Sequence, residues 1–285
     1  MLPDVQADVP SHGSSIFDVA REAGVSRATA ARALGGYGSV SEEARSRVES
    51  AAERLGYSVN SVARSMVTGQ TMTLGVLIAD VSNPFFARVI RGFTDGARQA
   101  GYDVVIVNTD ETVETEVHGL KLLTEKRVDG ILVAPASAGV GEHLTTAVAR
   151  GQALIQVDRF IPGLDTDVVV VDNYESSLRA VRWVIASGHS RIAAPILRTS
   201  GRSGHGNLIS TMQERHQGYR DAMAEAGLPV PEIYVPSAHG RAEVRAVVTE
   251  MLARPERPTA LFGLDDSFTL GIIDAVYASD LLIPD

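Results

Sequence analysis

The chain has 285 residues, 45% of them hydrophobic, and a formal net charge of −9 at pH 7. This length allows one large or two smaller hydrophobic cores, and the acidic balance argues against a protein that coats nucleic acid non-specifically. The absence of cysteine excludes disulfides, thiolate zinc sites and cysteine nucleophiles. Residues 1–14 are polar and acidic, unlike a signal peptide, and no later apolar run reaches the ~18 residues of a membrane-spanning helix, so we expect a cytoplasmic protein with no membrane partner.

Residues 15–57 have the pattern of three short helices, preceded by a disordered extension over residues 1–14. Residues 16–23 stop at Gly24, and the next two helices follow Ser26 and Ser41, where serine is a favoured N-cap residue. Seven arginines stand against six acidic residues between residues 15 and 70, so this segment lacks the acidic balance of the whole chain. The pattern predicts a small helical head.

The first two helices of this head have the spacing of a helix-turn-helix, whose second helix enters the major groove of DNA. One face of that second helix carries arginines and small residues, and Ala30, Ala33 and Leu34 point to the other side. Arginines placed there can read guanine at ~1–3 kcal/mol each, and hydroxyls can bind phosphates. The predicted DNA-contacting residues of the head are Ser26, Arg27, Ala28, Thr29 and Arg32. On spacing alone, a structural helical cap with solvated arginines is the alternative.

From residue 73 onwards, short β-rich runs alternate with amphipathic helical stretches. Near-continuous Val, Ile and Leu suit strands that are buried on both faces, and the alternation predicts parallel sheets with helical crossovers. The expected strands cover residues 73–80, 103–108, 129–135, 153–158, 167–172, 191–197, 232–236 and 259–265. Because only a short loop separates the fourth strand from the fifth, we expect a boundary between two lobes near residue 162.

Several stretches, in this order, carry a resemblance to a known family. They are DVAREAGVSRATAARAL, VSEEARSRVESAAERLGY, NSVARSMVTG, SNPFFARVIRGF, VDR, GHSRIA, ERHQGYRDAMAEAGL and LDDSFTLGIIDAV. Over about residues 15–285 the chain resembles the lac repressor (LacI/GalR) family of bacterial transcriptional regulators. The resemblance implies a small all-α helix-turn-helix head and an α/β two-lobed, periplasmic-binding-protein-like body with parallel sheets. It implies a head at 15–57, a hinge helix or linker at 58–71, and N-terminal and C-terminal lobes at 72–162 and 163–285.

In the resembling family the hinge becomes helical when it pairs with its dimer mate on DNA, and a leucine wedges into the minor groove. Met66 occupies that leucine position, and its flexible thioether can still act as an apolar wedge. The resemblance therefore assigns DNA contacts to Asn60, Ala63 and Met66. Val59 replaces the family's proline, which predicts a less rigid entry to the hinge.

Polar and aromatic residues follow the ends of several predicted strands, which is where α/β folds bind ligands. Two adjacent aromatics are not expected to face one core together, so at least one of Phe85 and Phe86 is expected to face a cleft. Buried charges at strand ends need partners, which the vicinal hydroxyls of a sugar can supply. The candidate ligand-binding residues are Asn83, Phe85, Phe86, Asp158, Arg159, Arg215, His239 and Asp265.

On the residues alone, each candidate has another explanation: a phenylalanine in the core, Arg159 paired with Asp158, or a solvated Arg215. The resemblance favours the cleft, because most of these positions match residues that grip the sugar in ribose-binding relatives, and it implies a pentose-type pocket. Asp265 replaces the usual asparagine, which turns a donor–acceptor into an acceptor only. His239 stands near a position that often holds a stacking aromatic, so the choice of sugar stays open.

The sequence thus predicts a repressor that binds a pseudo-palindromic operator in double-stranded DNA as a homodimer and responds to a small sugar. We expect no catalytic residues, cofactor or metal, because the chain has no Walker or GxSxG motif and no metal-ligand spacing. A doubly wound α/β enzyme with an incidental helical cap is one alternative. The chain stops where the resembling family continues into another strand, so we expect an incomplete C-terminal lobe. A truncated, ligand-insensitive DNA-binding product is therefore the other alternative.

Overall fold

The structure, a computed structural model, describes residues 14–57, 65–66, 68–137, 139, 141–197, 209–231, 233–236 and 241–284. Its contacts divide the chain into two compact units, Met1–Met72 and Thr73–Asp285, here called the head and the body. The predictions for Asn60, Ala63 and His239 lie outside the described residues.

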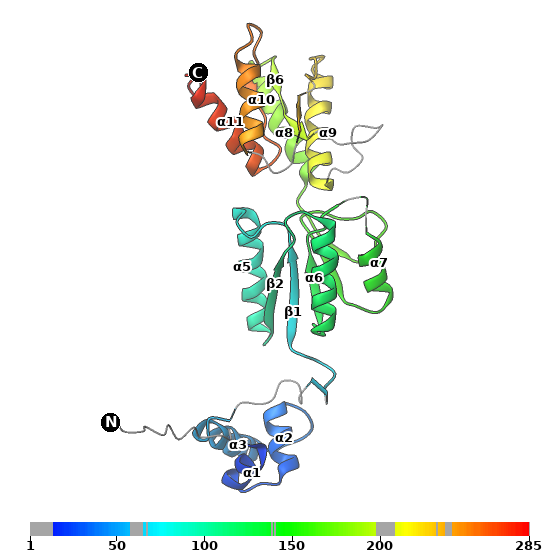
Figure 1. Cartoon of the computed structure of the whole chain (residues 1–285), viewed down its shortest axis with the longest axis vertical. Helices are drawn as coiled ribbons and strands as arrows, with labels where there is room; N and C mark the ends of the chain where they lie inside the picture. Colours follow the sequence, from blue (N-terminus) through cyan, green and yellow to red (C-terminus); the bar gives the residue numbers. More distant parts are fainter. Residues whose placement is uncertain are drawn as a thin grey trace, which may run out of the picture. The chain divides into compact units, whose positions relative to one another are not determined.

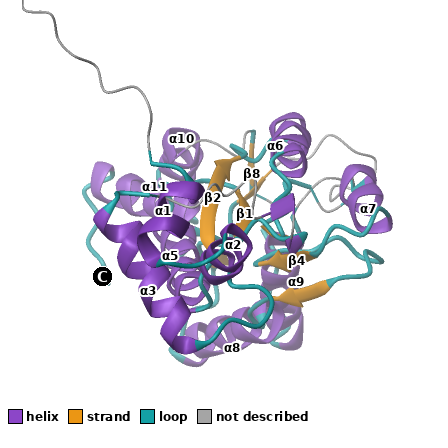
Figure 2. Cartoon of the chain, turned by 90° about the horizontal axis from the view of Figure 1, so that it is seen from below, coloured by secondary structure: helices purple, strands orange, loops and turns teal. Residues whose placement is uncertain are grey.

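The head contains the three predicted helices, α1 (Ile16–Ala23), α2 (Arg27–Gly35) and α3 (Glu42–Arg54). Each begins after a serine whose hydroxyl accepts a backbone N–H three residues further on, and Gly24 closes α1 in the left-handed conformation with φ 62°. The three helices share one apolar core, built largely from alanine and valine. Figure 2 shows the described part of this unit as helix and loop, whereas β1 and β2 of the body run as adjacent strands.

The N-terminal lobe of the body contains one five-stranded parallel sheet with the order β2-β1-β3-β4-β5. Its strands are β1 (Thr73–Ile78), β2 (Asp103–Asn108), β3 (Gly130–Val133), β4 (Leu154–Val157) and β5 (Asp167–Val169). Because β5 pairs with β4, the boundary predicted near residue 162 falls inside this lobe and is wrong. Here a parallel pair is joined by a short loop, whereas such pairs usually need a crossover of a dozen or more residues.

Helices cover both faces of this sheet. Helix α5 (Pro84–Gln99) packs on Val76 and Ile78, while α6 (Val113–Glu125) and α7 (Glu142–Ala149) pack with Leu77 on the opposite face. Figure 1 shows β2 and β1 between α5 and α6. The alternation along β1 confirms that the inner strand is buried on both sides. The prediction fails at the two edge strands, β2 and β5, where most residues are exposed or only partly buried.

The C-terminal lobe consists of helices around very short strands. The helices are α8 (Asn173–Ala186), α9 (Ser210–Glu225), α10 (Arg241–Leu252) and α11 (Asp266–Ala278). The strands are β6 (Ile192–Ala193), β7 (Ile196–Leu197), β8 (Tyr234–Val235) and β9 (Ala260–Leu261), with β6 paired to β9 and β7 to β8, both in parallel. The strand expected at 191–197 is split at Pro195, because proline has no N–H to donate to a sheet.

The predicted fold class is confirmed: an all-helical head and an α/β body with parallel sheets. No helix in the part of the chain that the structure describes has the length and apolar character needed to span a bilayer.

Candidate functional site

Helix α2 presents the predicted face. Arg27 and Ala28 are exposed, whereas Ala30 and Ala33 are buried in the core of the head, as their spacing predicted. The Ser26 hydroxyl accepts the Thr29 N–H at 3.1 Å, and the two side-chain hydroxyls lie 2.9 Å apart. The exposed start of α2 therefore carries an arginine and two linked hydroxyls, the groups that DNA-reading helices use for bases and phosphates.

Neither arginine of α2 projects freely. The Arg27 guanidinium lies 4.9 Å from the centre of the Phe17 ring, and Phe17 is 61% exposed at the start of α1. The Arg32 Nε donates to the Ala28 carbonyl, one turn earlier, at 3.2 Å. The sequence interpretation missed Phe17. The sequence held one signal for it: Phe17 is a large aromatic that does not fit the apolar spacing of its helix, which indicates an exposed side chain.

In the segment predicted to be a hinge, Met66 is 79% exposed and so is free of the head's core. The wedge role predicted for it stays a prediction.

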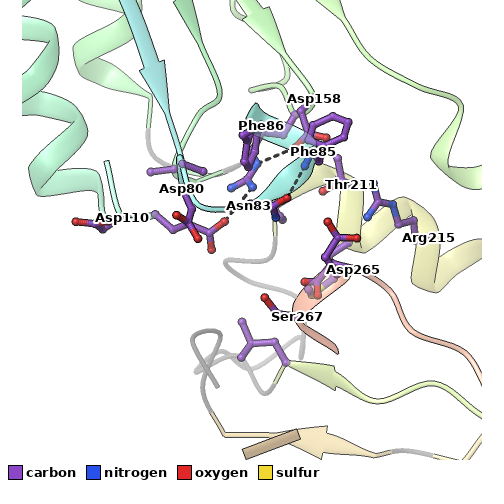
Figure 3. A pocket seen from close by; sticks show the side chains of 18 of the residues that line it. Asp80, Asn83, Phe85, Phe86, Asp110, Asp158, Thr211, Arg215, Asp265 and Ser267 are labelled. Atoms are coloured by element: carbon purple, nitrogen blue, oxygen red, sulfur yellow. Dashed lines mark hydrogen bonds and ion pairs between the residues drawn. The ribbon is translucent and has the colours of Figure 1, made fainter. Parts of the chain in front are cut away.

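The body contains a cleft of about 670 Å³ at the carboxyl ends of its strands. Seven of the eight candidate ligand-binding residues line it, and the eighth, His239, is outside the described residues. Figure 3 shows Asn83, Phe85 and Phe86 from one lobe near Arg215 and Asp265 from the other. The rule that ligand groups follow the ends of parallel strands therefore predicted correctly which residues, far apart in the sequence, meet in the cleft.

The aromatic pair begins α5. The Asn83 side chain caps this helix by accepting the Phe85 N–H at 2.8 Å, and Pro84 occupies its first turn. The two rings meet edge to face, with centroids 5.2 Å apart. Phe86 is buried, Phe85 is partly buried, both pack on the same apolar cluster, and both line the cleft. The premise that adjacent aromatics cannot share one core is therefore wrong here, although the expectation of an aromatic wall holds.

Arg159 is the most constrained charge in the cleft. It is 3% exposed, its Nε donates to Asp158 at 3.3 Å, and its Nη2 donates to Glu111 at 3.0 Å. The guanidinium also lies 5.6 Å from the centre of the Phe86 ring. Among the described residues its Nη1 has no hydrogen-bond partner. A buried donor without an acceptor is costly, so this nitrogen is available for an oxygen that the described residues do not supply.

Three residues of the cleft wall hold unusual backbone conformations. Asp110, Glu111 and Asp158 have φ values of 49°, 56° and 67°, in the left-handed region that favours glycine. Such conformations cost about 1–3 kcal/mol each and persist where the surrounding structure enforces them, often at functional sites. Burial raises the pKa of Asp158 above its usual value, and the neighbouring Arg159 opposes that shift.

On the opposite wall, Arg215 at the start of α9 is held by neutral acceptors. Its Nε donates to the Asn173 side-chain oxygen at 2.8 Å and its Nη1 to the Leu264 carbonyl at 2.7 Å. Arg215 is therefore a cross-link between α9, the start of α8 and the segment before α11, not the solvated side chain of the alternative explanation. Asp265 caps α11 by accepting the Phe268 N–H at 2.7 Å, and burial raises its pKa.

The sequence interpretation missed three carboxylates of the cleft: Asp80, Asp110 and Glu111. All three follow the ends of β1 and β2, so the rule applied to the other strands would have found them. Among the described residues, no group of three or more His, Cys, Asp or Glu side chains is arranged to hold a metal ion.

These features define a class of protein: a helix-turn-helix head combined with a two-lobed α/β body that has a polar ligand cleft. Comparison with known proteins agrees. The profile described as "Bacterial regulatory proteins, lacI family" matches residues 15–60. The profile described as "Periplasmic binding proteins and sugar binding domain of LacI family" matches residues 71–284.

Among similar proteins, catabolite control protein A of Priestia megaterium is 32% identical over 272 residues, covering 95% of this chain and 79% of the relative. A crystal structure of a protein assigned as a ribose operon repressor from Burkholderia thailandensis is 30% identical, with a TM-score of 0.64, covering 75% of this chain and 77% of that one. The lac repressor dimer bound to operator and the anti-inducer ONPF shares the fold, with a TM-score of 0.75, 21% identity and coverage of 95% and 79%.

The chain belongs to the LacI family of bacterial regulatory proteins. It is a DNA-binding transcriptional regulator and not an enzyme, which removes the doubly wound enzyme alternative.

Proposed function

We propose that this regulator is a repressor that binds a pseudo-palindromic operator as a homodimer. We propose further that its affinity for the operator falls or rises when a small sugar of the pentose type enters the cleft. The observation that carries the proposal is the convergence of seven predicted residues on one cleft, with a buried Arg159 that lacks one acceptor. The similarity to a protein assigned as a ribose operon repressor supports the pentose class.

In this proposal the exposed start of α2 reads DNA. Arg27 and Arg32 contact bases, Ser26 and Thr29 contact phosphates, and Ala28 allows close approach to the groove. Met66 acts as the apolar wedge of the hinge, since its side chain is exposed. Two-fold pairing of heads explains why an operator with two half-sites is expected.

The effector acts by linking the two lobes. Asn83, Phe86 and Arg159 contribute one wall and Arg215 and Asp265 the other, so a bound sugar has partners on both. A ligand that prefers the closed arrangement shifts the population toward it, and a coupling of ~1–3 kcal/mol to DNA binding is usual for such systems.

The experiment is selection of DNA sites from a random pool, followed by titration of the selected site by fluorescence anisotropy with and without a panel of pentoses, hexoses and polyols. We expect one sugar to change the DNA affinity about 5- to 150-fold. Arg215→Ala should abolish this response while leaving the affinity for DNA without sugar intact. Arg220→Ala, an exposed position on the same helix, is the matched control.

Two results would refute the proposal. If no half-site pattern emerges from the selection, the dimeric repressor assignment fails. If DNA binds specifically but no compound changes its affinity, the regulator does not sense a sugar, and the ligand-insensitive alternative holds.

A further inference from the structure

Among the described residues of the cleft, carboxylates outnumber cations. Six acidic side chains of this part of the chain line it, against two guanidinium groups. One of the two, Arg159, already binds two of those carboxylates, Asp158 and Glu111. The other, Arg215, is oriented by an amide oxygen and a carbonyl. The positive charge of the site is therefore largely committed to the protein before any ligand arrives.

The remaining carboxylates have no such compensation. Asp80, Asp110, Asp265 and Asp266 form no ion pair with a lysine or arginine in the described part of the chain. Asp80 accepts from the Ser82 N–H and hydroxyl, and Asp110 from the Asn108 amide. Carboxylate oxygens only accept hydrogen bonds when ionised, so this cleft offers acceptors in excess and repels anions.

One buried donor balances that excess. The Arg159 Nη1 has no partner among the described residues and belongs to a side chain that is 3% exposed. A single neutral oxygen of a ligand would satisfy it. The complement of this wall is a molecule with many hydroxyl donors and at least one acceptor oxygen.

Helix N-termini usually favour anions, but the N-terminus of α11, which lies nearest these acids, is already occupied by a carboxylate of the protein. Asp265 caps α11 with its own carboxylate, and Asp266 adds a second negative charge in the first turn. Helix α9 differs, because its N-cap residue Ile209 makes no side-chain cap, and the following Thr211 lines the cleft. The first turn of α9 is therefore where a phosphate would bind if the surrounding carboxylates tolerated it.

We propose that the cleft takes a polyhydroxylated effector without negative charge, and that Asp265 is the residue that excludes phosphorylated and carboxylated analogues. This inference rests on the proposed effector function and narrows its ligand class. Asp265 has the leading role because it is partly buried at the cleft wall and forms no ion pair with a lysine or arginine of the described residues. A buried charge discriminates more strongly than the exposed Asp110 and Asp266, which water screens.

The test compares neutral sugars and polyols with their own phosphate and carboxylate derivatives, for example ribose, ribitol, ribose 5-phosphate and ribonate. Binding to the full chain is measured by calorimetry and thermal shift. We expect the charged derivative of the bound sugar to bind at least about tenfold more weakly than the neutral parent. Asp265→Asn should narrow this gap about tenfold, because the amide can donate to an anion. Asn is also a favoured N-cap, so α11 keeps its cap.

Asp165→Asn is the control, since Asp165 is exposed and does not line the cleft, but its substitution removes the same charge. Tighter binding of a phosphate or carboxylate derivative to the unmodified protein overturns the ligand class but leaves the effector function intact. An unchanged gap in Asp265→Asn, in a variant that still unfolds in one cooperative transition, overturns the role of Asp265. If no compound binds and DNA affinity never responds, the proposed effector function itself fails and the inference with it.

Discussion

A buried carboxylate paired with a partly buried imidazole beside the cleft offers the sharpest test of how the N-terminal lobe is held together. Glu116 on α6 is fully buried, accepts the Ala136 N–H at 2.7 Å, and accepts from the His143 Nε2 of α7 at 2.6 Å. Ala136 itself lines the cleft. The Glu116 carboxylate therefore ties two helices to the loop that forms part of the ligand site.

Replacing Glu116 with alanine leaves two partly buried donors, the Ala136 N–H and the His143 ring nitrogen, without acceptors. Each such loss costs ~1–3 kcal/mol, so we expect Glu116→Ala to lower the free energy of unfolding of the body by roughly 2–4 kcal/mol. For a domain of this size, 1 kcal/mol corresponds to about 2–4 °C, and the melting temperature should fall by about 5–15 °C. Glu116→Gln keeps one acceptor and the shape, so its loss should be about half as large.

Urea unfolding and calorimetric melts measure this loss directly. The control is Glu114→Ala, an exposed acid on the same helix, which should change stability by less than about 0.5 kcal/mol. If Glu116→Ala is no less stable than this control, the two short hydrogen bonds contribute nothing net, and the reasoning from burial is refuted.

Three further outcomes are expected. Phe17→Ala should release the Arg27 guanidinium and reduce discrimination among selected DNA sites about 2- to 5-fold, with the slope of log affinity against log salt unchanged, whereas Phe17→Trp should preserve discrimination. Ser41→Ala should destabilise the head by ~1 kcal/mol in thermal melts because α3 loses its cap, while the exposed mid-helix Ser50→Ala should not. Burial raises the pKa of Asp265, so the protonated side chain is favoured in the folded protein; its stability contribution is complete below the usual aspartate pKa and is lost as the pH rises through the raised value. Asp265→Asn should therefore gain more stability, relative to the unmodified protein, at pH 7 than at pH 4. Unfolding measured at both pH values tests this, and an equal gain at both would refute it.

Local chemistry explains why the head could be predicted so closely. The serine caps, the closing Gly24 and the alanine spacing of α2 all act within a few residues of each other. The inner strands were equally predictable, because a strand that is buried on both faces has a continuous run of apolar residues in the sequence. The edge strand β5 was not assigned to the correct lobe, since no local pattern records which sheet a strand joins.

The residues that line the cleft could be predicted from the sequence, but the hydrogen bonds and ion pairs among them could not. That Arg159 and Asp265 follow strand ends can be deduced from the chain alone. The ion pair of Arg159 with Glu111 and the hydrogen bond of Arg215 to Asn173 join residues far apart in the sequence. Such pairings depend on the register and tilt of packed elements, so only the folded structure reveals them.

Those bonds have a consequence for the proposed mechanism, in which a ligand draws the two lobes together. Arg159 is fixed within one lobe and Arg215 within the other, each by partners of its own lobe. Neither side chain needs to lose rotamer freedom when a ligand enters, so more of the ligand's binding energy remains for drawing the lobes together. The Phe160 N–H already donates to the Ser210 hydroxyl at 3.1 Å, where the chain leaving β4 meets the start of α9. A short polar contact at this crossing can be exchanged during closure at little cost, whereas an apolar seam there would hold the lobes in one arrangement.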